Sequence, residues 1–236
     1  MDLDWTVLIE GGVPRLILAG LATTVQLTVY ATILALVLGT ILALLRNSRF
    51  RAIKTVSTWI VDFVRSTPPL VQLLFWYFGA SYIFPQATYY WLVQNDLKFS
   101  IAIIGLGLYQ SAFIAEVIRS GLQSVPRGQM EAALTVGLSK MQAMGYVIFH
   151  QVLRITLLPL INELLSLMKN TSLAVAIGVA ELTYVASELQ DRTFRVVEAF
   201  TAITVIYLIL SLSITFGSKF IGRRLKVGST KRLQGI

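Results

Sequence analysis

Long stretches without charge dominate the pattern of hydrophobic and polar positions along this chain. Residues 16–45, 66–95 and 199–218 contain no Asp, Glu, Lys or Arg. Residues 100–115 form a shorter uncharged stretch, and residues 155–180 are apolar apart from Glu163 and Lys169. A helix needs about 20 apolar residues to cross the hydrocarbon core. The pattern therefore predicts an all-α membrane protein with five spanning helices, at about 16–45, 58–83, 99–118, 155–180 and 197–221.

Composition supports a bilayer as the solvent of this chain. Hydrophobic residues make up 56% of the 236 positions, charged residues only 14%, and the mean hydropathy is +0.72. A soluble domain carries roughly a quarter charged residues, and this chain has too few to cover a water-exposed surface.

The basic residues predict an orientation with the N-terminus outside and the C-terminus in the cytoplasm. In that orientation the inner segments hold fourteen Lys and Arg residues and the outer segments four, against eight outer acids. Those acids are Asp2, Asp4, Glu10, Asp96, Glu181, Glu188, Asp191 and Glu198. The pI near 9.9 then reflects cytoplasmic loops beside anionic membrane lipid, and no nucleic-acid partner is expected.

The chain divides into three predicted parts. Residues 1–15 form an outer segment with a short interfacial helix near residues 5–9, and their acidic start argues against a cleavable signal peptide. Residues 16–222 form the transmembrane domain, which includes a long inner loop at 119–154. Residues 223–236 form a polar, basic cytoplasmic tail that we expect to be partly disordered.

Enzymatic chemistry has little support in these residues. The chain contains no cysteine and a single histidine, His150, which argues against thiolate and histidine metal sites. It has no GxxxxGK[ST] phosphate-binding pattern and no convincing nucleophile–base cluster. We expect no catalytic residue, no metal, no cofactor and no nucleotide site of its own.

Two predicted spans carry ionisable groups, which are expensive in the membrane and usually mark a functional interior. On span 155–180, Glu163 shares one helical face with Thr156, Pro159, Ser166 and Asn170. Lys169 lies about 120° around the helix from Glu163, so a straight helix does not pair the two.

On span 58–83, Asp62 and Arg65 have the i,i+3 spacing of an ion pair. Pro68 and Pro69 remove two backbone donors and free carbonyl groups to face a cavity. The alternative is that these polar groups join helices or anchor span ends at the interface, as Arg65 and Lys169 can by snorkelling. The predicted substrate pathway comprises Glu163, Asn170, Ser166, Thr67, Arg65, Asp62, Gln72 and Lys169.

The inner loop carries a recognisable pattern. Glu131-Ala132-Ala133 followed by Gly137 resembles the EAA motif of ABC importer permeases. Residues 112–129 (AFIAEVIRSGLQSVPRGQ), 63–72 (FVRSTPPLVQ) and 167–173 (LMKNTSL) are similar to the polar amino-acid uptake branch of that family. The resemblance covers nearly the whole chain, from Thr23 to Phe216.

This resemblance implies the type I ABC importer fold, in a bacterial inner membrane. It implies three partners: a cytoplasmic ABC ATPase dimer, a second permease subunit, identical or related, and a periplasmic or lipid-anchored amino-acid-binding protein. The loop would form a coupling helix that docks on the ATPase through Glu131, Ala132, Ala133, Gly137, Arg127 and Gly128. One departure is His150, which stands where the family usually has proline and would soften the bend before span 155–180.

The mechanism implied is alternating access driven by ATP hydrolysis in the partner subunits. As a hypothesis, Glu163 binds the ammonium group of the amino acid, and Asn170, Arg65 or Thr67 bind its carboxylate. A competing interpretation is an ion-coupled secondary transporter with Glu163 and Asp62 as proton or sodium sites, although such transporters are often built from repeats that this sequence lacks. A purely structural subunit would leave both polar faces without a purpose.

Overall fold

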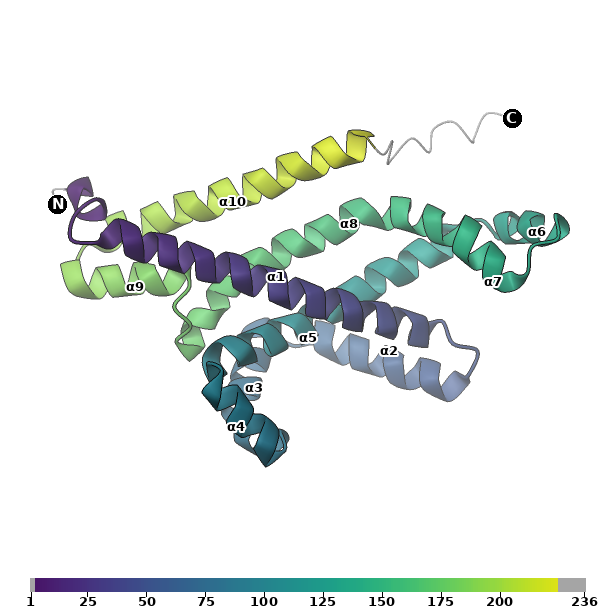
Figure 1. The fold of residues 1–236 in the computed structure, drawn as a ribbon, viewed down its shortest axis with the longest axis horizontal. Helices are drawn as coiled ribbons and strands as arrows, with labels where there is room; N and C mark the ends of the chain where they lie inside the picture. Colours follow the sequence, from purple (N-terminus) through teal and green to yellow (C-terminus); the bar gives the residue numbers. More distant parts are fainter. Residues whose placement is uncertain (1–2, 225–236) are drawn as a thin grey trace.

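The computed structural model describes residues 3–224, and every regular element in that range is a helix. The all-α prediction is therefore confirmed (Figure 1). Four stretches are long and apolar enough to cross a membrane: Val13–Arg46, Leu97–Ser124, Lys140–Ile177 and Val196–Gly222. Most of the predicted tail at 223–236 lies outside the described residues.

The region predicted as one span at 58–83 is divided into two helices. Helix α2 (Arg51–Ser66) has Thr67 as its C-terminal cap, and α3 (Pro69–Ile83) has Pro68 as its N-terminal cap. Thr67 and Pro68 both have extended backbone, with ψ of 143° and 138°. The cause is the Pro68-Pro69 pair, because a residue that precedes proline is pushed out of the helical region.

Helices α1 (Val13–Arg46) and α5 (Leu97–Ser124) form the centre of the fold. Small side chains let them approach closely, as Ala31, Ala35, Gly39 and Ala43 form a buried stripe with a four-residue period on α1. A Cβ atom at Gly39 would lie only 2.8 Å from the carbonyl oxygen of Ser111 on α5. Such small residues are typical of helix contacts in membranes, where van der Waals packing drives association.

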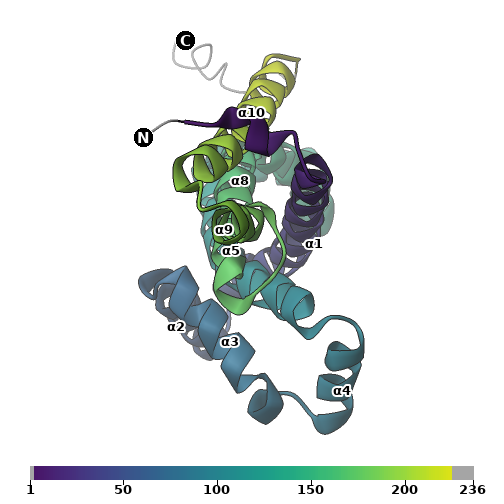
Figure 2. The same ribbon diagram turned by 90° about the vertical axis from the view of Figure 1, so that its left-hand side faces the viewer.

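The remaining long helices, α8 (Phe149–Asn170) and α10 (Val196–Arg224), complete the bundle. Helix α8 continues into the 3-10 helix η3 (Thr171–Ile177). Helices α2, α3 and α4 (Gln86–Gln94) lie to one side of this bundle (Figure 2).

Short helices gather at the two ends of the molecule (Figure 1). At one end lie the 3-10 helix η1 (Trp5–Leu8), where a short helix is predicted, and α9 (Leu182–Thr193), where only an outer loop is expected. At the other end lie α6 (Arg127–Thr135), α7 (Lys140–Gln142) and the turn between α1 and α2. The predicted inner loop 119–154 is thus mostly helical: its first residues belong to α5, and a π-helix, η2 (Ala143–Ile148), joins α7 to α8.

Candidate functional site

Glu163 lies on α8 and faces α5, where it meets the buried side chain of Gln110. The Nε2 atom of Gln110 donates to Oε2 of Glu163 at 2.5 Å, and Gln110 is only 2% exposed. Both residues line a cavity of about 220 Å³ between α1, α5 and α8. The hydroxyl of Thr32 on α1 also borders this cavity and has no hydrogen-bond partner among the described residues. The cavity therefore presents a carboxylate, an amide and a hydroxyl within an apolar lining.

Lys169 lies on a different side of α8. It borders a groove of about 390 Å³ whose other lining residues include Ser172 of η3 and Thr204, Tyr207 and Ser211 of α10. Glu163 and Lys169 thus open into separate spaces, in keeping with their predicted angular separation.

The other polar residues of the predicted α8 face differ in how exposed they are. Ser166 is exposed and Asn170 is half-buried at the last position of α8. Thr156 is 2% exposed, and its Oγ1 donates to the carbonyl of Val152 at 2.8 Å. Of this face, Glu163, Ser166 and Asn170 remain available to a solute, whereas Thr156 belongs to the packing between helices.

The break between α2 and α3 is closed by one side chain. Nε2 of Gln72 donates to the carbonyl of Val64 at 2.8 Å and to Oγ1 of Thr67 at 2.5 Å. The Thr67 hydroxyl in turn donates to the carbonyl of Phe63 at 3.1 Å. The carbonyl of Val64, whose helical donor is missing at Pro68, is therefore satisfied locally, and Gln72 and Thr67 use their polar atoms for this purpose.

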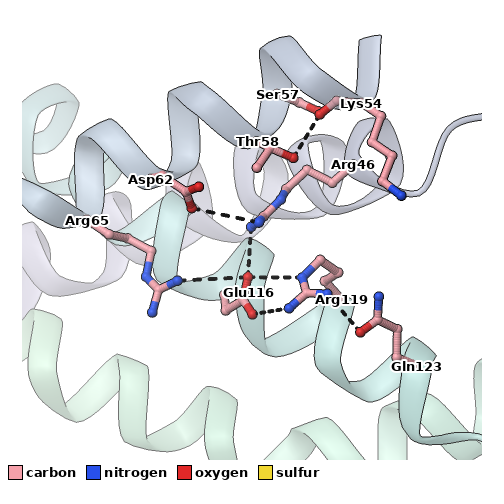
Figure 3. A network of polar contacts seen from close by, with 9 residues as sticks. All are labelled: Arg46, Lys54, Ser57, Thr58, Asp62, Arg65, Glu116, Arg119 and Gln123. Carbon is pink, nitrogen blue, oxygen red and sulfur yellow. Dashed lines mark hydrogen bonds and ion pairs between the residues drawn. The ribbon is translucent and has the colours of Figure 1, made fainter. Parts of the chain in front are cut away.

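An ionic network joins α1, α2 and α5, and Figure 3 shows three arginines directed at the carboxylate of Glu116. Arg46 donates to Oε2 at 2.8 Å and Arg119 donates through Nε at 3.0 Å, while its NH2 pairs with Oε1. Arg65 contributes a longer contact of 3.9 Å. Asp62 lies 3.8 Å from Arg46 and is 58% exposed.

The predicted pair of Asp62 with Arg65 is wrong. Among residues 3–224, Asp62 forms its ion pair with Arg46 of α1, and Arg65 forms its own with Glu116 of α5. Arg65 also stacks over the ring of Phe113 at 5.4 Å. The partners on α1 and α5 lie within reach of α2 because all three helices pack together, and an i,i+3 spacing does not reveal this.

Three residues that sequence reasoning passed over form specific contacts between elements. Gln110 is uncharged and lies in the apolar stretch 100–115, so its side-chain amide is the only feature of the sequence that could have pointed to it. Glu116 stands out in the sequence merely as the boundary of an uncharged run. Glu181 is counted among the outer acids, yet it is fully buried and accepts hydrogen bonds from the hydroxyl of Tyr207 at 2.6 Å and the amide of Tyr184 at 2.9 Å.

Helix α6 contains the Glu-Ala-Ala triplet and ends in a defined cap. Gly137 has φ of 87°, in the left-handed region. Its amide donates to the carbonyl of Leu134 at 3.0 Å, and the amide of Leu138 donates to the carbonyl of Ala133 at 3.2 Å. This pair of bonds is the Schellman motif, for which glycine is the preferred residue because it lacks a Cβ. Gly137 therefore ends α6.

The surface around α6 combines exposed polar and apolar groups. Arg127, Gly128, Glu131 and Ala132 are exposed, whereas Ala133 is 5% exposed and packs inward. Large apolar side chains are exposed nearby, with Val136 77%, Met141 84% and Tyr146 70% accessible. Exposed apolar groups gathered beside polar ones are typical of a protein–protein contact surface.

The link from α6 to α8 is continuous and mostly helical. Ser139 and Gln142 form a capping box at α7, the π-helix η2 follows, and α8 begins directly after it. The side chains of Gln151 and Gln129 join α8 to α6 at 3.0 Å. His150 is exposed and its Nδ1 lies 3.2 Å from the carbonyl of Gly145, so it occupies a regular helical position.

Comparison with known proteins gives a consistent result. The sequence matches the family described as "Binding-protein-dependent transport system inner membrane component" over residues 35–227. It is 37% identical over 207 residues to the probable amino-acid ABC transporter permease protein PatM of Vibrio harveyi, covering 88% of this chain and 89% of that protein. It is 33% identical over 230 residues to the glutamine transport system permease protein GlnP of Escherichia coli (strain K12), covering 96% and 100%. The glutamate/aspartate import permease protein GltJ of the same strain is 30% identical over 213 residues, with 89% and 87% covered.

Solved structures share the fold. A crystal structure of an amino acid ABC transporter with histidines matches with a TM-score of 0.82 and 32% identity, covering 95% of this chain and 100% of that one. The MetNI methionine ABC transporter in inward-facing conformations matches with a TM-score of 0.74 over 92% and 99% of the two chains. At 20% identity the second likeness concerns the fold alone.

Proposed function

This chain belongs to the family of binding-protein-dependent transport system inner membrane components and is the permease component of an amino-acid ABC transporter, and we propose that it imports polar amino acids by alternating access. ATP binding and hydrolysis take place in a pair of cytoplasmic ATPase subunits. A second permease, identical or related, completes the pathway, and an external binding protein delivers the amino acid.

The capped helix α6 is the observation that carries this proposal. It stands at the end of the molecule opposite η1 and α9 (Figure 1), and its Glu131 and apolar neighbours are exposed to a partner. A short rigid helix at this place suits a groove on an ATPase, because its conformation is fixed before docking. Arg127, Gly128, Glu131, Ala132, Ala133 and Gly137 form the proposed coupling segment.

Relatives support a polar substrate. Two of those above are named for glutamine and for glutamate or aspartate, and the similar crystal structure contains histidines. These amino acids share an α-ammonium and an α-carboxylate group. We assign the ammonium to Glu163, whose cavity is apolar enough to strengthen a charge contact. The carboxylate then falls to Asn170 or Arg65, because Thr67 and Gln72 use their polar atoms at the break between α2 and α3. Lys169, Ser166 and Asp62 complete the proposed pathway.

The test is reconstitution with candidate ATPases and binding protein in proteoliposomes, with amino-acid uptake measured with and without ATP. The informative variant is Gly137→Asp, because an added side chain is strained at φ of 87° and the new charge lies on the proposed docking surface. A matched control is Gly11→Asp, since Gly11 also has a positive φ of 57° and open space around it, at the opposite end of the molecule.

We expect the wild type and the Gly11→Asp variant to retain the ATPase and to take up amino acids only with ATP and binding protein, whereas the Gly137→Asp variant loses both. Uptake by the wild type without ATP or any partner would overturn the proposal in favour of an ion-coupled transporter.

A further inference from the structure

Glu116 holds together three helices at the end of the molecule that bears α6. Its two carboxylate oxygens receive Arg46 from α1 and Arg119 from its own helix α5, and Arg65 approaches from α2 (Figure 3). One acid thus serves three cations, and Asp62 adds a second negative charge at longer range.

Arg46 depends most on this acid. Its side chain is 8% exposed and its Nε has no hydrogen-bond partner among the described residues. The remaining contact, to the half-exposed Asp62, is 3.8 Å long. A buried guanidinium needs a close counterion, so the position of the α1 end is tied to that of Glu116.

The same helix leads directly into the coupling segment. Helix α5 ends at Ser124, eight residues after Glu116, and only Val125 and Pro126 separate it from α6. Between Glu116 and Ser124 on α5, Gly121 packs against Thr156 of α8. The contact is so close that a Cβ atom on the glycine would clash with the Thr156 methyl group. The last turns of α5 therefore contact α8 on one side and, through Glu116, α1 and α2 on the other.

We propose that Glu116 is a positioning residue that transmits displacement of α6 to α1 and α2, so that the coupling segment and these helices move as one body. The inference rests on the proposed function, in which α6 is moved by an ATPase. Without the Glu116 contacts, α5 still moves with α6, but the Arg46 end of α1 and helix α2 follow it less closely. Hydrolysis then continues while uptake per ATP falls.

The decisive quantity is the number of ATP molecules hydrolysed per amino acid taken up, measured on the complete complex in proteoliposomes. Glu116→Gln removes the charge and keeps the shape, whereas Glu116→Asp keeps the charge on a shorter stem. Glu188→Gln is the control, because Glu188 forms an i,i+4 ion pair with Arg192 on α9, far from α6. Arg65→Gln removes the long, partly exposed contact to Glu116 together with the stacking over Phe113.

We expect Glu116→Gln to keep stimulated hydrolysis within about twofold of wild type while uptake per ATP falls about tenfold, the size of a typical coupling free energy. Glu116→Asp should recover part of that ratio, and Arg65→Gln, measured at saturating amino acid, should lower it about threefold, as expected for a partly exposed ion pair. A purely structural role lowers complex yield, hydrolysis and uptake together and leaves the ratio constant.

An unchanged ratio of ATP hydrolysed to amino acid taken up in Glu116→Gln overturns the inference about Glu116. The proposed function is unaffected by that result as long as uptake by the wild type depends on ATP. If Glu116→Gln does not assemble, an unchanged ratio in both Glu116→Asp and Arg65→Gln has the same meaning. Uptake by the wild type without ATP removes the proposed function itself.

Discussion

Gln110 on α5 donates a hydrogen bond to Glu163 on α8, so the acid within the transport domain is fixed in place by a neighbouring helix. The amide supplies one donor and leaves the carboxylate its negative charge. A carboxylate held this way on one side has its remaining acceptor sites free for a cationic group of the solute.

Glu163→Gln tests the charge separately from the geometry. A glutamine at this position still accepts the hydrogen bond from Gln110, so we expect normal assembly. KM for the amino acid should rise about tenfold or more, because a hydrogen bond to a charged group contributes about 1.5–3 kcal/mol. Uptake kinetics in proteoliposomes measure this, with Glu10→Gln in the N-terminal segment as the control. Unchanged KM and rate would remove Glu163 from the substrate site.

Gln72→Leu opens the break between α2 and α3. The part-buried carbonyl of Val64 and hydroxyl of Thr67 lose their common donor. Because the Thr67 hydroxyl still reaches the Val64 carbonyl at 3.3 Å, the expected cost is that of a lost hydrogen bond, about 0.5–1.5 kcal/mol. We expect faster hydrogen exchange over residues 64–72 and a lower Tm. Gln86→Leu is the control, since the amide of Gln86 reaches only the exposed hydroxyl of Tyr90. Equal exchange in both variants would show that the break is held by its prolines alone.

Gly121→Ala places a methyl group against Thr156. The clash between the two methyl groups forces the helices apart, and overpacking of this kind costs about 1–3 kcal/mol. The double variant Gly121→Ala, Thr156→Ser removes the opposing methyl and keeps the hydroxyl, so most of the lost stability should return. Thermal unfolding in detergent measures both, and Gly145→Ala, where nothing lies within 4 Å, should be neutral. Failure of the double variant to recover would place the strain elsewhere.

Tyr207→Phe deprives Glu181 of a side-chain donor. Glu181 is fully buried and keeps the backbone amide of Tyr184 and the hydrogen bonds from Thr183, but it loses a close side-chain donor, so we expect a loss of about 1–3 kcal/mol in unfolding free energy. The expected first effect is detachment of α9 from α10, seen as proteolysis within residues 182–193. Tyr82→Phe is the control, because Tyr82 is 91% exposed. Equal stability of the two variants would mean that water replaces the lost hydroxyl.

Features encoded locally were predictable from the sequence. The charge-free runs predicted the long helices, and the left-handed cap of α6 falls on the glycine that follows the Glu-Ala-Ala triplet, in line with the preference of such caps for glycine. The Pro68-Pro69 pair predicted freed carbonyls. Hydropathy alone nevertheless joined α2 and α3 into one span, since an average over the window does not register a two-residue break.

Contacts between helices could not be predicted from the sequence. The pairing of Gln110 with Glu163 joins positions 53 residues apart, and that of Arg46 with Glu116 joins positions 70 apart. Each depends on how α1, α5 and α8 are rotated against one another, which the small residues of α1 determine by close packing. The spacing of Asp62 and Arg65 suggested a local pair that the neighbouring helices replace.

The π-helix η2, between α7 and α8, accommodates one extra residue without rotating the faces of these two helices relative to each other. A π turn holds about one residue more than an α turn, and such turns commonly arise as a single-residue bulge in an α-helix. Removing one residue from Ala143–Ile148 would restore a regular α-helix and leave the faces of α7 and α8 in their present phase. The same deletion inside α8 would turn everything before it by about 100° and misalign α6 with its partner. Chains of this fold whose α7–α8 segment is one residue shorter should therefore carry the gap at η2.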